Sequence, residues 1–377
     1  MACVAPFRCA PARRAPGGAA RGGRTTRAAA SQFAGPPAEF NLRQATRAAG
    51  AALAAQHPSL AGLVEEGVLL AVPRPPSTVY SERRLDGYSE PGLVVLLGTS
   101  HLSRRSADDV ALTVATLRPQ AVAVELCRSR TGALFAEEGA ATSALSLTGD
   151  RGFLPALSRA LRLGGGAALL LRAALAAASS RVAGPAAQQL GAEFAAARKA
   201  ADAVSATILL ADRPVEVTLS RALAACSWSE RARGVGALAQ LLLSRRDAPS
   251  VTAEQMDALL ASDSSVDALL SGFATQFPSL TPVLVHERDS YLAWSLCRSK
   301  AVCGAGVVVA VLGKGHLRGV TWALQPQNRD QLRFDDLSGR ADARAAALAR
   351  RPLWQRMAQD TLLAGFAVAL WSACVNS

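Results

Sequence analysis

Residues 94–110 have the sequence VVLLGTSHLSRRSADDV, an apolar run that breaks at Gly98 and is soon followed by His101. A brief run rich in β-branched residues is typical of a buried parallel strand. The segment after it has helical spacing of its apolar residues and ends at Pro119. Residues 121–127, AVAVELC, then predict a second buried strand. The pattern indicates a strand–helix–strand unit, whose parallel strands place both carboxyl ends at one edge.

The rest of the chain continues this alternation. Residues 206–223, ATILLADRPVEVTLSRAL, predict a strand, a turn and a helix, and residues 282–299 predict another helix. Residues 307–320, VVVAVLGKGHLRGV, contain the last clear strand. The Ala- and Leu-rich stretch 130–205 predicts a helical insertion. We therefore expect an α/β fold with a mainly parallel or mixed sheet, a large helical insertion and additional C-terminal helices.

Four regions are expected along the chain: 1–38, 39–90, 91–325 and 353–377. The first holds six arginines and no acidic residue, and it lacks a long apolar segment. This composition predicts an organellar transit peptide, with a chloroplast favoured and a mitochondrion as the alternative. The six arginines account for half of the formal net charge of +12. The remainder of the chain shows no basic run interleaved with aromatics, so we expect no nucleic-acid partner.

The second region begins with a helical pattern over residues 41–67, NLRQATRAAGAALAAQHPSLAGLVEEG. Several prolines in residues 71–92 then predict a linker or irregular lead-in. On this interpretation, the folded alternation starts at Gly92, and the domain that carries function spans 91–325.

The C-terminal region contains an uncharged apolar run, Thr361–Val375, preceded by Arg356 and followed closely in sequence by the end of the chain. The run is shorter than the roughly 20 residues that span a bilayer. Two interpretations stay open for 353–377: a tail anchor that attaches the protein to a membrane, or a terminal helix that packs into the domain. The cysteines are scattered without short paired spacings, which argues against a zinc ribbon or a thioredoxin-type site.

Two segments share the spacing G-x-x-H, Gly98 to His101 and Gly313 to His316, and each closes an apolar strand. In an open α/β sheet, ligands bind outside the carboxyl ends of the strands. A histidine there offers a metal-binding nitrogen or a base that titrates near neutrality. The repeated spacing predicts that both histidines contribute to one site.

Charged residues follow other strands in the same way. Glu125 follows the second strand, and a buried carboxylate needs a partner. A metal, an arginine such as Arg128 or Arg130, or a proton shared with histidine would satisfy it. Two histidines and one carboxylate would suit zinc or a similar divalent ion and leave a position for water. Further polar residues predicted at this edge are Asp212, Arg213, Glu287, Arg288 and Asp289.

Five motifs in order, LLGTSHLS, AVAVELCRSR, LLADRPVEVTLSRA, HERDSYLAWSL and VVAVLGKGHLRGV, resemble the TraB family and its PrgY, GumN and TIKI relatives. The resemblance covers roughly residues 92–325. It implies a metal-dependent peptidase site with His101, His316 and Glu125, and it places Asp212, Arg213 and the residues of the HERD motif beside that site. Lys314 departs from the small or neutral residue expected inside the second G-x-x-H motif.

The leading hypothesis from the sequence is a metal-dependent, peptidase-like hydrolase that acts on a peptide or small molecule. Zinc, manganese or cobalt would be held by His101, His316 and Glu125, with catalytic roles for Glu125, Arg213 and Glu287. The expected substrate-binding residues are Gly98, Thr99, Arg128, Asp212, Arg288, Asp289, Gly313 and Gly315. The alternative is a non-enzymatic binding or tethering protein associated with an organelle membrane.

Overall fold

A single sheet organises the structure, a computed structural model that describes residues 35–74, 88–100, 104–135, 191–227, 229–230, 232–233, 236, 272, 274–331 and 334–338. In these residues five strands have the order β1-β2-β5-β3-β4. They are β1 (Leu69–Pro73), β2 (Leu93–Thr99), β3 (Ala121–Val124), β4 (Thr207–Leu210) and β5 (Val307–Gly313). β1 is antiparallel to β2, and the other neighbours are parallel. The expected α/β fold with a mixed, mainly parallel sheet is confirmed.

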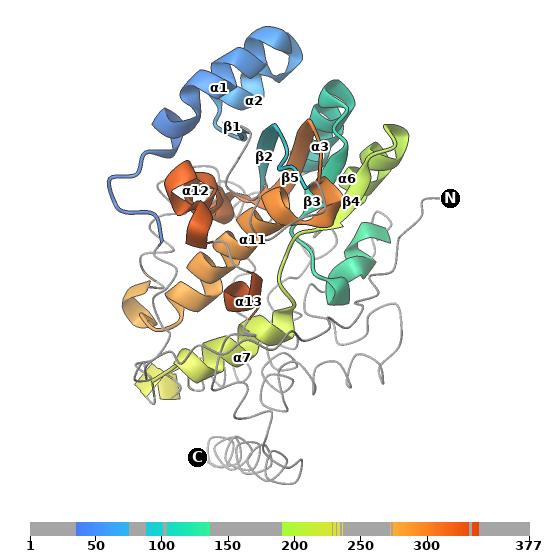
Figure 1. Cartoon of the computed structure of the whole chain (residues 1–377). Helices are drawn as coiled ribbons and strands as arrows, with labels where there is room; N and C mark the ends of the chain where they lie inside the picture. Colours follow the sequence, from blue (N-terminus) through green and yellow to red (C-terminus); the bar gives the residue numbers. More distant parts are fainter. Residues whose placement is uncertain are drawn as a thin grey trace, which may run out of the picture.

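Helices cover both faces of the sheet, because the central strands are apolar on both sides. α3 (Arg104–Leu117) and α6 (Ala192–Ala203) pack on the face that presents Val95, Leu97, Val122 and Val124 (Figure 1). α11 (Glu287–Arg298) and α12 (Lys314–Leu324) pack on the opposite face. Successive residues of a strand point to opposite faces, so one apolar run serves both layers.

The lead-in contributes more to the fold than the sequence predicted. α1 (Leu42–Gln56), η1 (Pro58–Leu60) and α2 (Ala61–Glu65) follow the expected helical pattern, which ends at Gly67 in the left-handed region with φ 75°. The next residues form β1, which pairs along the whole of its length with β2. The prediction that residues 71–92 are a linker and that the folded alternation starts at Gly92 is therefore wrong for Ala71–Pro73. Pro73 is tolerated because β1 is an edge strand.

The remaining elements are short helical segments and the helix α7 (Val215–Ala225). The short segments are η3 (Arg128–Phe135), η5 (Pro282–His286), η6 (Lys300–Val302), η7 (Pro326–Gln331) and α13 (Phe334–Leu337). α7 and α13 lie below α11 in Figure 1. The predicted leader up to residue 34, most of the predicted insertion 130–205 and the C-terminal region 353–377 lie outside the described residues.

Buried polar contacts fasten the opposite edge of the sheet. Arg74, directly after β1, donates to the carboxylate of Glu90 and to the main-chain oxygen of Leu324. The side chains of Arg74 and Glu90 are 1% and 2% exposed. Tyr88 donates its hydroxyl to the carbonyl of Cys297 at 2.5 Å. These contacts tie the lead-in to α11 and α12 at the edge away from the strand ends predicted to form the site.

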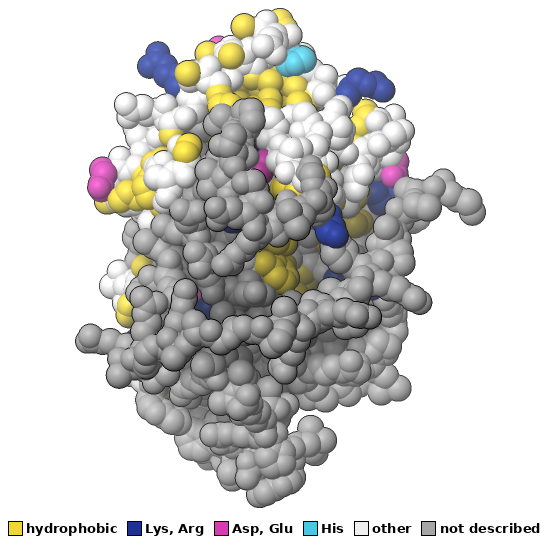
Figure 2. Space-filling model, viewed as in Figure 1, with side chains coloured by type: hydrophobic (Ala, Val, Ile, Leu, Met, Phe, Trp, Pro, Cys, Tyr) yellow, Lys and Arg dark blue, Asp and Glu magenta, His cyan; other side chains and the backbone are white. Residues whose placement is uncertain are grey.

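The surface and the helices of the described region add two observations. Lys and Arg side chains on the face shown in Figure 2 lie apart from one another and do not form one basic patch. Among the helices that the structure describes, none has the length and hydropathy needed to cross a bilayer.

Candidate functional site

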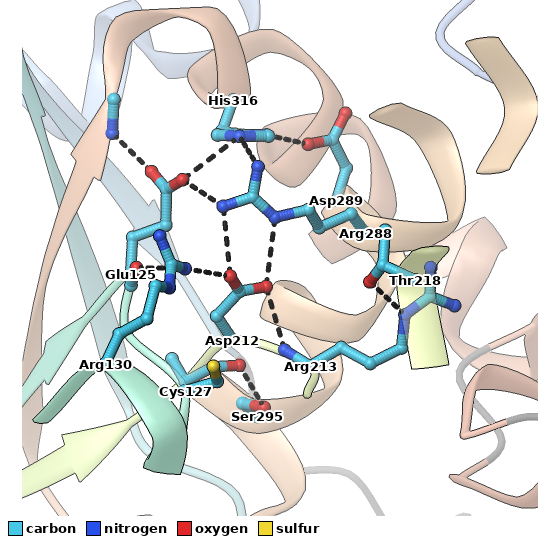
Figure 3. Close-up of polar contacts among 12 residues, drawn as sticks. Glu125, Cys127, Arg130, Asp212, Arg213, Thr218, Arg288, Asp289, Ser295 and His316 are labelled. Carbon is cyan, nitrogen blue, oxygen red and sulfur yellow. Dashed lines mark hydrogen bonds and ion pairs between the residues drawn. The ribbon is translucent and has the colours of Figure 1, made fainter. Parts of the chain in front are cut away.

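Polar side chains from three strand ends and two helix starts meet at the carboxyl edge of the sheet (Figure 3). Glu125 follows β3, Asp212 lies two residues beyond β4, and His316 lies in the first turn of α12, directly after β5. Arg288 and Asp289 lie in the first turn of α11. The sequence predicted that these residues share one edge, and the structure brings all five together.

The guanidinium of Arg288 is the centre of this group. Its Nε donates to Oδ1 of Asp212 and its Nη2 to Oδ2, each at 3.0 Å. Nη2 also donates to the carboxylate of Glu125. Burial would lower the pKa of Arg288, but the carboxylates of Asp212 and Glu125 outweigh burial and raise it. Arg288 thus keeps its charge and pairs with two strand-end carboxylates at once.

Both oxygens of Glu125 have fixed partners. Oε2 accepts the main-chain N–H of Gly313 at 2.8 Å. Oε1 contacts Arg288 and lies 3.3 Å from Nε2 of His316. β5 lies between β2 and β3 in the sheet, so the direct strand neighbour of Glu125 is the strand that ends in the second G-x-x-H motif. The carboxylate therefore spans from its own strand to the start of α12.

His316 is held from both sides of its ring. Nδ1 lies 2.5 Å from Oδ1 of Asp289, and Nε2 lies 3.3 Å from Oε1 of Glu125, with Nη1 of Arg288 3.0 Å away. Burial alone would lower the pKa of His316, but the negative charges of Glu125 and Asp289 raise it to about 10. Burial also raises the pKa of Asp289, which the His316 imidazolium partly offsets. At neutral pH this pair carries the proton on histidine.

Gly319 makes room for Asp289, a role that no motif in the sequence indicated. A Cβ built at Gly319 would lie 1.8 Å from Oδ2 of Asp289. Gly319 lies one helical turn after His316 on α12, so the missing side chain lets α12 approach α11 closely enough for the Asp289–His316 contact. This role could not be predicted from the sequence, because Asp289, which Gly319 accommodates, belongs to another helix.

Arg213 and Glu287 form a deeper layer. Arg213 donates to Oε2 of Glu287 at 2.8 Å, and its side chain is 0% exposed. Its other donors contact the hydroxyl of Thr218 and the carbonyls of Val283 and Leu337. Arg221 binds both oxygens of Glu287 at 2.7 Å. Burial lowers the pKa of Arg213 and Glu287 counteracts it. These contacts favour a structural role, fastening β4 and α7 to the start of α11, over the catalytic role predicted for both residues.

The sequence offered Arg128 or Arg130 as the partner of the Glu125 carboxylate, and of these two Arg130 lies at the site. Arg130 donates to Oδ2 of Asp212 at 2.5 Å and to the main-chain carbonyl of Glu125 at 3.0 Å. Arg128 is exposed. The partner of the Glu125 carboxylate is neither of them but Arg288, which comes from a helix more than a hundred residues later. Asp212 thus forms ion pairs with two arginines, Arg130 and Arg288.

The glycines and the threonine that were predicted to bind substrate lie at the ends of β2 and β5 and at the start of α12. A Cβ at Gly98 would lie 2.6 Å from Cδ1 of Leu317, so this glycine admits α12 close to β2. Thr99 is buried and donates its hydroxyl to the carbonyl of Leu312 at 3.2 Å. Gly313 ends β5, and Lys314 and Gly315 begin α12. The contacts described for Gly98 and Thr99 join β2 to α12 and to β5.

His101 and its two following residues lie outside the described residues, so the predicted pairing of His101 with His316 stays a prediction. Within the described residues, no group of three or more His, Cys, Asp or Glu side chains has the arrangement of a metal site. His286 precedes α11 in the short turn η5, consistent with a residue at a helix entrance.

The fold and the site together define an α/β protein with a charged cluster at the carboxyl edge of its parallel strands. The chain belongs to the TraB/PrgY/gumN family, whose model matches residues 87–326. The resemblance found in the five sequence motifs is thereby confirmed.

Similar proteins come from animals and an archaeon. TraB domain-containing proteins of Homo sapiens and Bos taurus are each 30% identical over 243 residues, which covers 60% of this chain and 61% of each relative. An uncharacterized protein of Methanocaldococcus jannaschii is 24% identical over 230 residues, covering 60% of this chain and 52% of that protein. The chain thus spans about three fifths of the length of the human and bovine relatives.

A substitution at Gly319 tests how closely α12 and α11 approach. In an ordinary helix interior, replacing glycine by alanine stabilises the fold by about 0.5–1 kcal/mol. We expect Gly319→Ala to destabilise it by about 1–3 kcal/mol, because the new methyl group must displace the Asp289 carboxylate. Chemical denaturation monitored by circular dichroism measures the difference.

Gly62 provides the matched control, since it lies in the helix α2 with no atom within 4 Å of a Cβ built there. Gly62→Ala should leave the free energy of unfolding unchanged or raise it. Equal effects of the two substitutions would contradict the close approach described for Gly319.

The charge of His316 predicts a dependence of stability on pH. The folded-state pKa is raised to about 10, whereas an unperturbed histidine titrates near 6.5. The charged ring therefore stabilises the fold fully below about pH 6.5, and this stabilisation is lost as the pH rises toward 10. With a chelator present, the difference in unfolding free energy between wild type and His316→Gln should shrink across this interval. A difference that is constant from pH 6 to 10 would contradict the assigned charge.

Proposed function

We propose that this chain is a metal-dependent hydrolase that acts on a peptide or a related small molecule. The observation that supports this proposal most directly is the contact between Glu125 and His316. Nε2 of His316 lies 3.3 Å from Oε1 of Glu125. Two ligands that each lie about 2.1 Å from a tetrahedral zinc are separated by about 3.4 Å. The pair therefore has the spacing that a divalent ion requires of two neighbouring ligands.

The far side of the histidine ring supports the same assignment. Nδ1 of His316 is engaged by Asp289, whose own position depends on the gap at Gly319. Metal-binding histidines commonly donate their second N–H to a carboxylate, which fixes the tautomer and orients the ring. The donor set of imidazole and carboxylate suits zinc, manganese or cobalt. His101, from the first G-x-x-H motif, is the third ligand in this proposal.

An ion would replace the proton on Nε2 of His316 and would require Nη1 of Arg288, which lies 3.0 Å from that nitrogen, to move away. The hold of Arg288 on Asp212 uses other donors, Nε and Nη2. The guanidinium can therefore give up His316 and stay at the site. In that position it provides a cation next to the reacting group, where a substrate carboxylate or a developing oxyanion needs one.

A bound divalent ion would supply Lewis acidity and a water of lowered pKa. The residues of the chain do the rest. Gly313 holds one oxygen of Glu125, and the other, which contacts Arg288, would bind the ion or accept a proton from water. Asp289 keeps the imidazole of His316 oriented. Asp212, which also pairs with Arg130, holds Arg288 in place, so that the guanidinium stays directed toward the site.

A non-enzymatic binding or tethering protein is the second candidate. The observation that favours it is that the described carboxylates of the site are all matched by cations or main-chain donors of the protein itself. On this alternative, attachment to a membrane through 353–377 and delivery to a chloroplast or a mitochondrion by the leader would decide its role. Both locations are proposals from the sequence.

Metal content distinguishes the two candidates. The full chain, purified in zinc, manganese or cobalt and dialysed, should retain close to one equivalent of one of these ions by mass spectrometry. We expect His316→Ala and Glu125→Gln to lower the affinity at least tenfold, because each removes a ligand. His57→Ala is the control, since His57 caps α1 away from the site and should have no effect.

A chelator should abolish hydrolysis of a peptide library by the wild-type chain, and added ion should restore it. A folded wild-type chain that binds none of the three ions would contradict the hydrolase proposal and leave the binding protein.

A further inference from the structure

The segment Gly35–Phe40, which precedes α1, lies against both helices that carry the site. Figure 1 shows this part of the chain descending from α1 beside α12. Its sequence, GPPAEF, is rich in proline and has no regular secondary structure of its own apart from a turn. Proline restricts the backbone, so less conformational entropy is lost when such a segment is held against a surface. We call it the strap.

Arg318 of α12 binds the strap through its backbone. Nη2 of Arg318 donates to the carbonyls of Pro37 at 2.9 Å, Ala38 at 3.1 Å and Phe40 at 3.4 Å. These carbonyls belong to one short turn, which the N–H of Phe40 closes by donating to the carbonyl of Pro37, and a single guanidinium contacts all three. The contact is independent of the side chains at those positions but requires this path of the backbone. Arg318 lies two residues after His316 on the same helix.

Aromatic packing adds a second attachment on α12. The rings of Phe40 and Trp322 meet edge to face with their centroids 5.1 Å apart. Such pairs contribute about 0.5–1.5 kcal/mol beyond the apolar area that they bury. Trp322 lies one turn beyond Arg318, so the strap follows the exposed side of α12 for more than a turn.

The other end of the strap reaches the entrance of α11. A Cβ built at Gly35 would lie 2.3 Å from Cε1 and 2.5 Å from Nδ1 of His286. His286 directly precedes Glu287, Arg288 and Asp289. Nδ1 of His286 is buried without a hydrogen-bond partner among the described residues, and burial lowers its pKa, so the ring packs as a neutral group. The strap thus covers the turn from which the charged residues of α11 emerge.

We propose that the strap sets the position of α12 relative to α11, and that Arg318 and Phe40 are positioning residues for His316. The contact between His316 and Asp289 joins the two helices at 2.5 Å. The strap is attached to each of these helices at the outer side. Loosening it would let α12 shift and would weaken that contact without removing any residue of the site.

The strap overlaps the region 1–38, which the sequence predicts as a leader. Pro37 and Ala38, whose carbonyls accept from Arg318, belong to both. The loss of residues 35–38 would therefore break the strap.

The test uses the full chain labelled with ¹⁵N at its four histidines, with chelator present, so that it does not depend on the proposed metal. We expect Arg318→Gln and Phe40→Ala each to move the ring ¹⁵N signals of His316 toward those of Asp289→Asn, while the signals of His57 stay in place. Amide hydrogen exchange in the first turns of α12 should rise at least tenfold, with the sheet still protected.

Controls separate positioning from general destabilisation. Arg47→Gln removes an exposed arginine of α1 and should change neither readout. Arg318→Lys keeps a cation that reaches the same carbonyls and should restore most of the His316 signal. Gly35→Ala attacks the other end of the strap and should shift His286 and His316 together. Unchanged His316 signals in folded Arg318→Gln and Phe40→Ala chains would overturn the proposal, whatever the outcome for metal binding.

Discussion

The contact of Arg288 with Asp212 and Glu125 is the interaction on which the rest of the site depends. Two buried carboxylates, Glu125 and Asp212, follow the neighbouring strands β3 and β4, and an isolated charge in such a place is strongly unfavourable. One guanidinium pairs with both of them and lies close to His316. Because Arg288 comes from the helix before β5, this single side chain joins three separate parts of the chain. These contacts hold the ends of β3 and β4 and the start of α11 together.

The ion pairs at the strand ends form two layers with different burial. The deeper layer, in which Arg213 and Arg221 hold Glu287, fastens the start of α11 and is closed to solvent at Arg213. The upper layer of Arg288, Glu125 and His316 is less buried, with side chains 21%, 6% and 14% exposed. Rigid support below a more accessible charged group is the arrangement expected of a preorganised binding or catalytic site.

The helix pair α11 and α12 shows how glycine positions shape this chemistry. Gly98 admits Leu317, and Gly319 admits Asp289, so α12 can lie close to both the sheet and its neighbouring helix. His316 is carried into reach of Glu125 and Asp289 by these close approaches. The strap reinforces the same geometry from outside. The two glycines thus allow the close approach that brings the imidazole into place.

Much of the fold and the shared edge could be predicted from the sequence, because buried parallel strands leave an unmistakable apolar run with a polar residue at its end. Glu125, Asp212 and His316 were found in this way. β1 was missed because the prolines around it dominate the local pattern, although an edge strand tolerates them. The partner of Glu125 was missed because sequence distance favours Arg128 or Arg130, whereas the sheet order brings Arg288. His101 remains the part of the prediction that lies outside the described residues.

A double-mutant cycle on Arg288 and Asp212 tests the central claim most directly. The free energy of unfolding would be measured for wild type, Arg288→Met, Asp212→Asn and the double variant. If the guanidinium and the carboxylate neutralise each other, the single substitutions will each destabilise strongly and the double substitution will cost less than their sum by about 1–3 kcal/mol. Additive effects would show that the two charges are independent, and the account of the site as one electrostatic unit would be wrong.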